Sequence, residues 1–339
     1  MANSADAPKV RIEYLDIAKA IGILCIIAGH MGMPKVDRVV FTFHVPLFFL
    51  ISGYFLNNTE RMDCFVIKKA KSLLIPYYFT GICLILIKIP INIIKGAADQ
   101  IPKDIFHTLL QVLYASGTNT NHTIAGIRSI GAIWFLFALF WAEIIVRISL
   151  DKIKGGGMLI IAAVTGYYTS RYVWLPFNLQ AGAVSAIFVY LGALCKKKKV
   201  SEKSDWKIIL AGFIALLLEV YFGIALYCVS NTYDYGIVSM IGAVLISGSV
   251  IEISKYIGKC RFLKKVLLFY GKNSMIILCW HLIELNNIPW DSLFSKMRIL
   301  SEEPLLQSVL VFWAKLLFVT VCTYITLKVE FLKKIFGKK

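Results

Sequence analysis

YLDIAKAIGILCIIAGHMG, residues 14–32, is an apolar stretch whose ionisable side chains include Lys19 and His30. As a helix, a stretch of this length crosses a hydrocarbon layer of about 30 Å. Ionisable groups inside a membrane span are unfavourable unless they face a polar interior, so each one is a candidate functional residue. The stretch therefore predicts a membrane helix that carries part of a functional site.

The rest of the chain is similarly apolar. Of its 339 residues, 58% are hydrophobic and 17% are charged, and the mean hydropathy is +0.71. Soluble domains have roughly 45–50% apolar and about 25% charged residues. The sequence predicts an all-α, polytopic membrane helix bundle that forms one domain over residues 1–339. About ten spans are expected, the fifth with the weakest pattern, at 14–32, 38–57, 72–95, 129–149, 157–173, 180–195, 206–229, 236–254, 266–284 and 305–327.

The net charge of +17 fits either a nucleic-acid-binding protein or a membrane protein with basic cytoplasmic loops. Lysines and arginines are roughly three times as frequent in alternate loops as in the others, which is the pattern of the positive-inside rule. Both termini are therefore expected in the cytoplasm. The run Lys196–Lys199 is interpreted as a cytoplasmic anchor, and no nucleic-acid partner is expected.

Lys19 and His30 of the first span share one helical face. Lys19 and His30 are eleven residues apart, which corresponds to about 20° of rotation and about 16.5 Å of rise along a helix. Asp16 precedes Lys19 by three residues and can form an ion pair with it. A purely structural pair, or a lysine that snorkels to the interface, is the alternative to a functional role for Lys19.

Three histidines are expected at one depth of the membrane. The alternating direction of the spans places His30, His44 and His281 near the outer surface. Such a group is typical of a metal site, a proton relay or a catalytic base. A base is favoured, and no metal is expected, because no acidic or thiol ligand is clearly placed at that level. Glu143 and Glu219 lie in other spans, where each can pair with a histidine or a basic residue or be purely structural.

A basic segment follows the second span. Lys68 and Lys71 share a helical face just below the expected membrane surface, where they are able to hold phosphate groups. Contact with lipid headgroups, or a role in membrane topology alone, is the simpler interpretation.

An amphipathic segment is expected in the only long outer loop, approximately residues 96–128. Ile105, Leu109, Leu110 and Leu113 recur there at helical spacing beside polar residues. The loop is interpreted either as a functional element or as a connector.

These features together resemble the membrane acyltransferase 3 family, and more narrowly its fucose 4-O-acetylase-like branch, over nearly the whole chain. The family often has arginines where this chain has lysines at 68–71, and lysine lacks the bidentate grip of arginine on phosphate. The matching blocks are Tyr14-Leu-Asp-Ile-Ala-Lys19 with Gly29-His30, Phe43-His44 through Ser52-Gly53-Tyr54, Lys68-Lys69-Ala-Lys71 through Pro76-Tyr77, Ile133-Trp134-Phe135-Leu136, and Gly271-Lys-Asn-Ser274 through Trp280-His281.

The resemblance implies an O-acyltransferase. It would move an acetyl group from cytoplasmic acetyl-CoA, a co-substrate, to a hydroxyl of a cell-envelope or exopolysaccharide sugar or of its lipid-linked precursor. No permanently bound cofactor is expected. The resemblance also indicates a bacterial source and a location in the cytoplasmic membrane, in contact with its lipids.

The resemblance also assigns roles to residues. Lys19, with Lys68 and Lys71, would bind the phosphorylated end of acetyl-CoA, and His30 would act as general base or as nucleophile. The expected supporting or acceptor-binding residues are His44, His281, Glu143 and Trp134.

Two other functional classes remain open. In a proton-coupled secondary transporter or glycan exporter, Asp16, Lys19, Glu143 and the histidines would form the pathway. Transporters commonly contain internal repeats, and the sequence shows none. An inactive receptor or scaffold is disfavoured by the ionisable first span.

Overall fold

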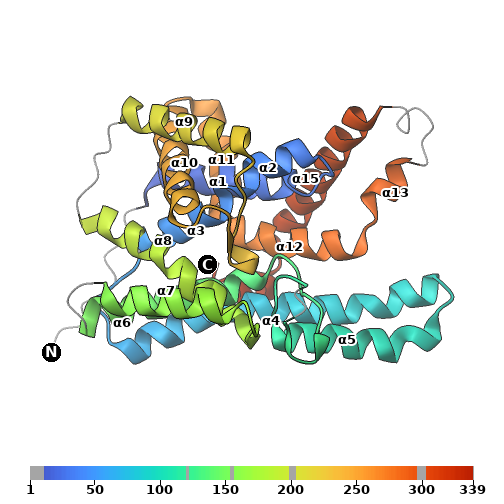
Figure 1. Ribbon diagram of the computed structural model, residues 1–339. Coiled ribbons are helices and arrows are strands. Elements are labelled where there is room, and N and C mark those ends of the chain that lie inside the picture. The colour runs from blue at the N-terminus through green and yellow to red at the C-terminus, as the bar shows by residue number, and fades with distance from the viewer. Residues whose placement is uncertain (1–10, 120–121, 153–155, 198–203, 296–302, 339) are drawn as a thin grey trace.

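Figure 1 shows the computed structural model, which describes residues 11–119, 122–152, 156–197, 204–295 and 303–338. Most of these residues are helical, so the all-α prediction is confirmed. The α-helices are α1 (Glu13–Ala28), α2 (Pro34–Phe41), α3 (His44–Tyr54), α4 (Met62–Ile94), α5 (Ile101–Tyr114), α6 (Trp134–Lys152), α7 (Gly157–Thr169), α8 (Leu179–Lys197), α9 (Trp206–Phe222), α10 (Ile237–Ile257), α11 (Arg261–Lys272), α12 (Ser274–Asn287), α13 (Trp290–Ser295), α15 (Pro304–Lys328) and α16 (Glu330–Ile335).

Short elements connect these helices. Single 3₁₀ turns occur at Ala98–Gln100, Ile124–Gly126, Pro176–Asn178 and Cys228–Ser230. Within the described residues, the only sheet is a hairpin of two antiparallel two-residue strands, β1 (Leu226–Tyr227) and β2 (Thr232–Tyr233).

Helix α1 lies at the centre of the contacts that matter for the site. It packs against α3, α10, α11 and α12. Figure 1 shows α9, α10 and α11 in the upper part of the molecule, α4 to α7 in the lower part, and α3, α8 and α12 between them. The chain therefore surrounds its first helix with segments that come from several distant parts of the sequence.

Each of the ten expected spans coincides with helical structure. Among the described residues, five helical segments are long and apolar enough to cross a membrane on their own, and a bent pair would make a sixth. The remaining expected spans contain α1, α6, α7 and α9, of which α7 has 13 residues. The number of crossings and the cytoplasmic location of both termini remain predictions. Lys198 and Lys199 of the expected anchor lie outside the described residues.

Several expected spans are shorter or interrupted. The first helix ends at Ala28, four residues before the expected end, in a segment that contains Gly29 and Gly32 and is followed by Pro34. The second is divided into α2 and α3. The seventh ends at Phe222, because Gly223 takes a left-handed conformation (φ +66°) that terminates α9.

The ninth expected span is a broken helix. Its two parts, α11 and α12, meet at an angle of 68°. Asn273 lies at the break with φ −113° and ψ 15°, outside the helical region. The break lies next to the packing of Gly271 against α1, where a Cβ atom would come within 1.7 Å of the carbonyl oxygen of Asp16.

Glycines allow a close crossing between α3 and α8. A Cβ atom on Gly53 would lie 1.9 Å from the carbonyl oxygen of Val189, and one on Gly192 would lie 1.9 Å from that of Leu50. Small residues of this kind let helix backbones approach each other in membranes. The crossing fixes α3, which carries His44 and Ser52, in the bundle.

Candidate active site

A cavity of about 490 Å³ runs along the first helix. Lys19, Ile23, Ile26 and His30 form one of its walls. These residues follow one another at spacings of four, three and four, which is a single face of an α-helix. The face that the sequence predicts is therefore the face that lines the cavity, with Lys19 and His30 at its two ends.

The other walls of the cavity are mainly apolar and aromatic. They come from the segment of α2 and α3, from the start of α6, from β1 and the turn after it, and from α12. The residues that line these walls include Phe41, His44, Val45, Phe48, Ser52, Trp134, Phe135, Tyr227 and Met275. A cavity of this size and character is typical of sites for small molecules and cofactors.

His30 is half-buried and its proton position is fixed by the backbone. Its Nδ1 lies 2.8 Å from the carbonyl oxygen of Ile26. A carbonyl oxygen only accepts, so Nδ1 carries the proton and Nε2 of the neutral ring keeps its lone pair. His30 thus has the tautomer that a general base or nucleophile requires at Nε2.

His44 is held in the same way. Its Nδ1 donates to the carbonyl oxygen of Val40 at 2.6 Å, and its ring contacts that of Phe41 with centroids 5.2 Å apart. The Phe41 ring in turn lies 5.9 Å from that of His30. Both histidines line the cavity, so the structure brings these two predicted residues to one end of it.

His281 packs directly against His30, with ring centroids 5.2 Å apart and planes 73° apart. It is fully buried and does not line the cavity. Its Nδ1 donates to Oε1 of Glu284 at 2.7 Å. Glu284 also accepts a hydrogen bond from the indole of Trp290, and Lys315 lies 3.8 Å from its Oε1. A buried carboxylate therefore acts on the His30 environment through His281.

Lys19 forms the ion pair that the sequence predicts. Its Nζ lies 2.6 Å from Oδ1 of Asp16, and the Nε of Arg11 lies 2.6 Å from Oδ2 of the same carboxylate. Lys19 is partly exposed, whereas Asp16 is buried. One carboxylate is thus shared by two cations at this end of the cavity.

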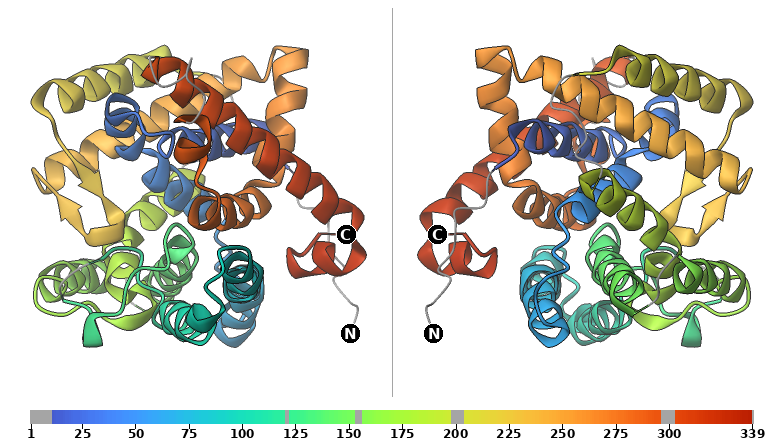
Figure 2. Two further views of the ribbon diagram at one scale, coloured as in Figure 1. Left: turned by 90° about the vertical axis from the view of Figure 1, so that its right-hand side faces the viewer. Right: turned by 90° about the vertical axis from the view of Figure 1, so that its left-hand side faces the viewer.

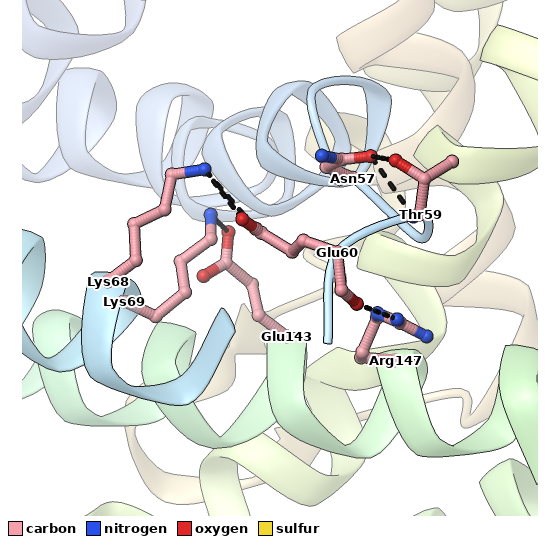
Figure 3. A network of polar contacts seen from close by, with 7 residues as sticks. All are labelled: Asn57, Thr59, Glu60, Lys68, Lys69, Glu143 and Arg147. Carbon is pink, nitrogen blue, oxygen red and sulfur yellow. Dashed lines mark hydrogen bonds and ion pairs between the residues drawn. The ribbon is translucent and has the colours of Figure 1, made fainter. Parts of the chain in front are cut away.

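The three lysines near the start of α4 have different surroundings, and Figure 3 shows those of Lys68 and Lys69. Lys68 forms an ion pair with Glu60 at 3.0 Å, and Lys71 is exposed; neither lines the cavity. Lys69 instead points inward and contacts Oε1 of Glu143 at 2.5 Å. The basic segment therefore places Lys69 closest to the interior.

Glu143 links this lysine to the cavity. It is buried in α6, and its Oε1 also accepts a hydrogen bond from Ser52, which lines the cavity. Nearby, Arg147 donates to the carbonyl oxygen of Glu60 at 2.6 Å (Figure 3). Of the two partners expected for Glu143, a histidine or a basic residue, the structure provides the basic residue.

A model of the acyltransferase domain family (Acyl_transf_3) matches residues 12–328, which is nearly the whole chain. The chain belongs to the acyltransferase 3 family. Neither the comparison with curated proteins nor that with solved structures gives a match. Family membership and the apolar helices together identify a membrane acyltransferase.

The remaining expected site residues of this acyltransferase are placed differently. Trp134 lines the cavity beside Phe135. Glu219 is buried where α9 packs on α10, against Gly242, and does not line the cavity. Within the described part of the chain, no group of three or more His, Cys, Asp or Glu side chains is arranged to hold a metal ion.

Two polar residues of the site were not expected from the sequence. Glu284 follows His281 by three residues on α12, so the spacing on one helical face was a usable signal. Lys69 had no such signal, because its partner Glu143 is 74 residues away.

Proposed function

We propose that this acyltransferase moves an acetyl group from acetyl-CoA to a hydroxyl of a cell-envelope or exopolysaccharide sugar, or of its lipid-linked precursor. Family membership supports acyl transfer, and the resemblance to the fucose 4-O-acetylase-like branch supports acetyl as the group and a sugar as the acceptor. The proposed location is the bacterial cytoplasmic membrane, with acetyl-CoA supplied from the cytoplasm.

One observation carries the proposal: a single cavity has a cation at one end and an imidazole base at the other. Lys19 suits the phosphorylated end of acetyl-CoA, and the apolar wall formed by Ile23 and Ile26 suits its neutral pantetheine arm. The thioester would then lie near His30. Lys68 and Lys71 lie outside this cavity, so their contribution would be to attract phosphate at the surface.

At His30 the acceptor hydroxyl loses its proton to Nε2 while its oxygen attacks the thioester carbonyl carbon. The carbon–sulfur bond breaks, and the CoA thiolate takes up the proton from the imidazolium. In the alternative route, Nε2 itself attacks the thioester carbonyl carbon and takes the acetyl group, and the carbon–sulfur bond breaks to release the CoA thiolate. The acceptor hydroxyl then takes the acetyl group from Nε2 and gives up its proton to that thiolate. Both routes use the same nitrogen, which the Ile26 contact leaves unprotonated.

The neighbouring histidines support this step. With Nδ1 bound to Val40, the neutral His44 offers only an acceptor at Nε2, which suits a hydrogen bond from a second hydroxyl of the sugar, one that is not acetylated. His281, held by Glu284, lies against the ring of His30. The negative charge behind it would stabilise the positive charge that His30 acquires during transfer.

The test uses purified protein in detergent or lipid with acetyl-labelled acetyl-CoA and candidate glycans. His30→Ala is expected to abolish transfer. Lys19→Ala is expected to raise the KM for acetyl-CoA more than the KM for the acceptor, because Lys19 lies at the donor end. His107→Ala is the matched control, because His107 lies on α5 and does not line the cavity.

Two results would overturn the proposal. Equal transfer by wild type and His30→Ala would exclude His30 as the catalytic residue. If wild-type protein consumes no acyl donor but moves a solute across vesicle membranes, the transporter or glycan-exporter interpretation is correct.

A further inference from the structure

The chain turns back on itself after its last long helix. Helix α16 follows α15 with one residue between them, Val329, in an extended conformation. Figure 2 shows α16 lying beside the end of α15. The ring of Phe336 packs edge-on against that of Phe79 on α4, with centroids 5.9 Å apart. The C-terminal segment, residues 330–338, is therefore attached to the helix bundle.

The backbone turns at a glycine near the end of this segment. Gly337 has φ +61°, a conformation that glycine adopts without strain, and the amide of Lys338 then donates to the carbonyl oxygen of Lys333 at 2.9 Å. The side chain of Lys338 leaves the segment at this turn. Its Nζ donates to the carbonyl oxygen of Lys272 at 2.6 Å.

This contact brings Lys338 to the base of the first helix. Lys272 is the last residue of α11, and Gly271 beside it touches the backbone of Asp16 so closely that no Cβ atom would fit. The Asp16 carboxylate holds Lys19 and Arg11. Lys338 is thus next to the end of the cavity at which Lys19 lies.

The charges at this junction are not balanced. The charged groups that act on Lys338 are one carboxylate, Asp16, and three cations, Arg11, Lys19 and Lys272, so Lys338 is the fourth cation at this junction. Burial, followed by the neighbouring Arg11 and Lys19, lowers the pKa of Lys338 to about 8. The remaining charged groups of its own segment include Glu330, which pairs with Lys333 at 2.8 Å. An anion placed among the four cations would be strongly favoured.

Two separate hollows border this junction. Lys19 lines the cavity that leads to His30, whereas Arg11 lines a second hollow of about 370 Å³ together with Lys255 and Lys259. Asp16 holds both cations between them. A long molecule with phosphates near one end and a neutral arm matches this arrangement.

We propose that Lys338 is a phosphate-binding residue of the acyl-donor site, delivered by the C-terminal segment to the junction of Arg11, Lys19 and Lys272. The inference rests on the proposed function, because it takes the phosphates to be those of acetyl-CoA. The alternatives are a purely structural tie, in which Lys338 only binds the carboxyl end of α11, and a contact with the phosphate of a lipid headgroup.

The experiment compares two donors in phosphate-free detergent: acetyl-CoA, and acetyl-pantetheine, which lacks every phosphate. Lys338→Ala is expected to lower kcat/KM for acetyl-CoA by about three- to tenfold, the value of one partly solvated hydrogen bond between charged groups. The kcat/KM of Lys338→Ala for acetyl-pantetheine is expected to equal that of the wild type. Lys338→Arg is expected to retain the wild-type kcat/KM for acetyl-CoA. Lys334→Ala is the matched control, because Lys334 is an exposed lysine of the same C-terminal segment, on α16.

Each other outcome has a definite meaning. Equal losses of kcat/KM with both donors would show that Lys338 has only a structural role and would overturn the proposal. No loss with either donor would also overturn it. A loss seen only in nanodiscs that contain anionic lipid would assign Lys338 to lipid headgroups instead. If wild-type protein neither binds nor uses acetyl-CoA, the proposed function fails as well, which separates that result from a failure of Lys338 alone.

Discussion

Glu284 offers the sharpest test of the histidine arrangement. Glu284→Gln replaces the carboxylate by an amide of the same size, whose oxygen is still able to accept from Nδ1 of His281. Geometry is therefore kept while the charge is removed. A hydrogen bond to a charged group contributes about 1.5–3 kcal/mol, and each 1.36 kcal/mol is a factor of ten in rate. Because His281 and Glu284 are both fully buried, solvent screens little of this interaction.

If the charge acts on the transition state through His281 and His30, kcat falls by roughly 10- to 150-fold. The KM for acetyl-CoA stays near its wild-type value, because Glu284 is at the opposite end of the cavity from Lys19. Initial rates of labelled acetyl transfer at varied donor concentration give both constants. Size-exclusion profiles and thermal unfolding confirm that the variant is folded.

The control is Trp290→Phe, which removes the other hydrogen bond to Glu284 but leaves its charge and its contact with His281. We expect kcat of this variant to change by less than about threefold. A Glu284→Gln protein that is folded and has wild-type kcat would refute the reasoning and reduce Glu284 to a packing role.

Three further predictions concern stability and pH. Lys69→Met is expected to destabilise the protein by about 3–5 kcal/mol, because it leaves the buried carboxylate of Glu143 uncompensated, and adding Glu143→Gln should recover most of this loss. Unfolding of the two single variants and of the double variant in detergent measures the free energies. Additive losses in the double variant would contradict the prediction. Lys338 is charged below its pKa of about 8 and loses its charge as the pH rises, so kcat/KM for acetyl-CoA should decline from about pH 7 to about pH 9. Lys338→Arg keeps its charge over this range and should abolish the decline. Gly192→Ala should lower the unfolding temperature, because the new Cβ atom meets the carbonyl oxygen of Leu50, and a wild-type unfolding temperature would argue against this crossing of α3 and α8.

Local patterns in the sequence predicted the features that depend on one helix. The shared face of Lys19 and His30 follows from helical periodicity, and the structure places both on one cavity wall. The ion pair between Asp16 and Lys19 follows from their spacing of three residues. The amphipathic pattern in the outer loop predicted a helix, and α5 occupies Ile101–Tyr114.

Features that depend on contacts between helices were beyond the sequence. Lys68, Lys69 and Lys71 have the same charge, and only the rotation of α4 against α6 decides that Lys69 meets Glu143. The break at Asn273 was hidden because the apolar run continues on both sides of it. Lys338 belonged to a basic terminus whose composition suggested topology alone, whereas its position depends on the turn at Gly337.

The chemical asymmetry of the cavity favours acyl transfer over solute transport. Its charged side chain, Lys19, lies at one end, and the ring of His30, with a free lone pair, lies at the other. Between them the wall consists of Ile23 and Ile26, which offer nothing to a polar or ionic solute in transit. A substrate that is anionic at one end, neutral along its length and reactive at its tip would place these three parts next to Lys19, next to Ile23 and Ile26, and next to His30. Acyl-CoA has that distribution of charge, and this match supports the proposal of a donor that stays in place while its acyl group leaves.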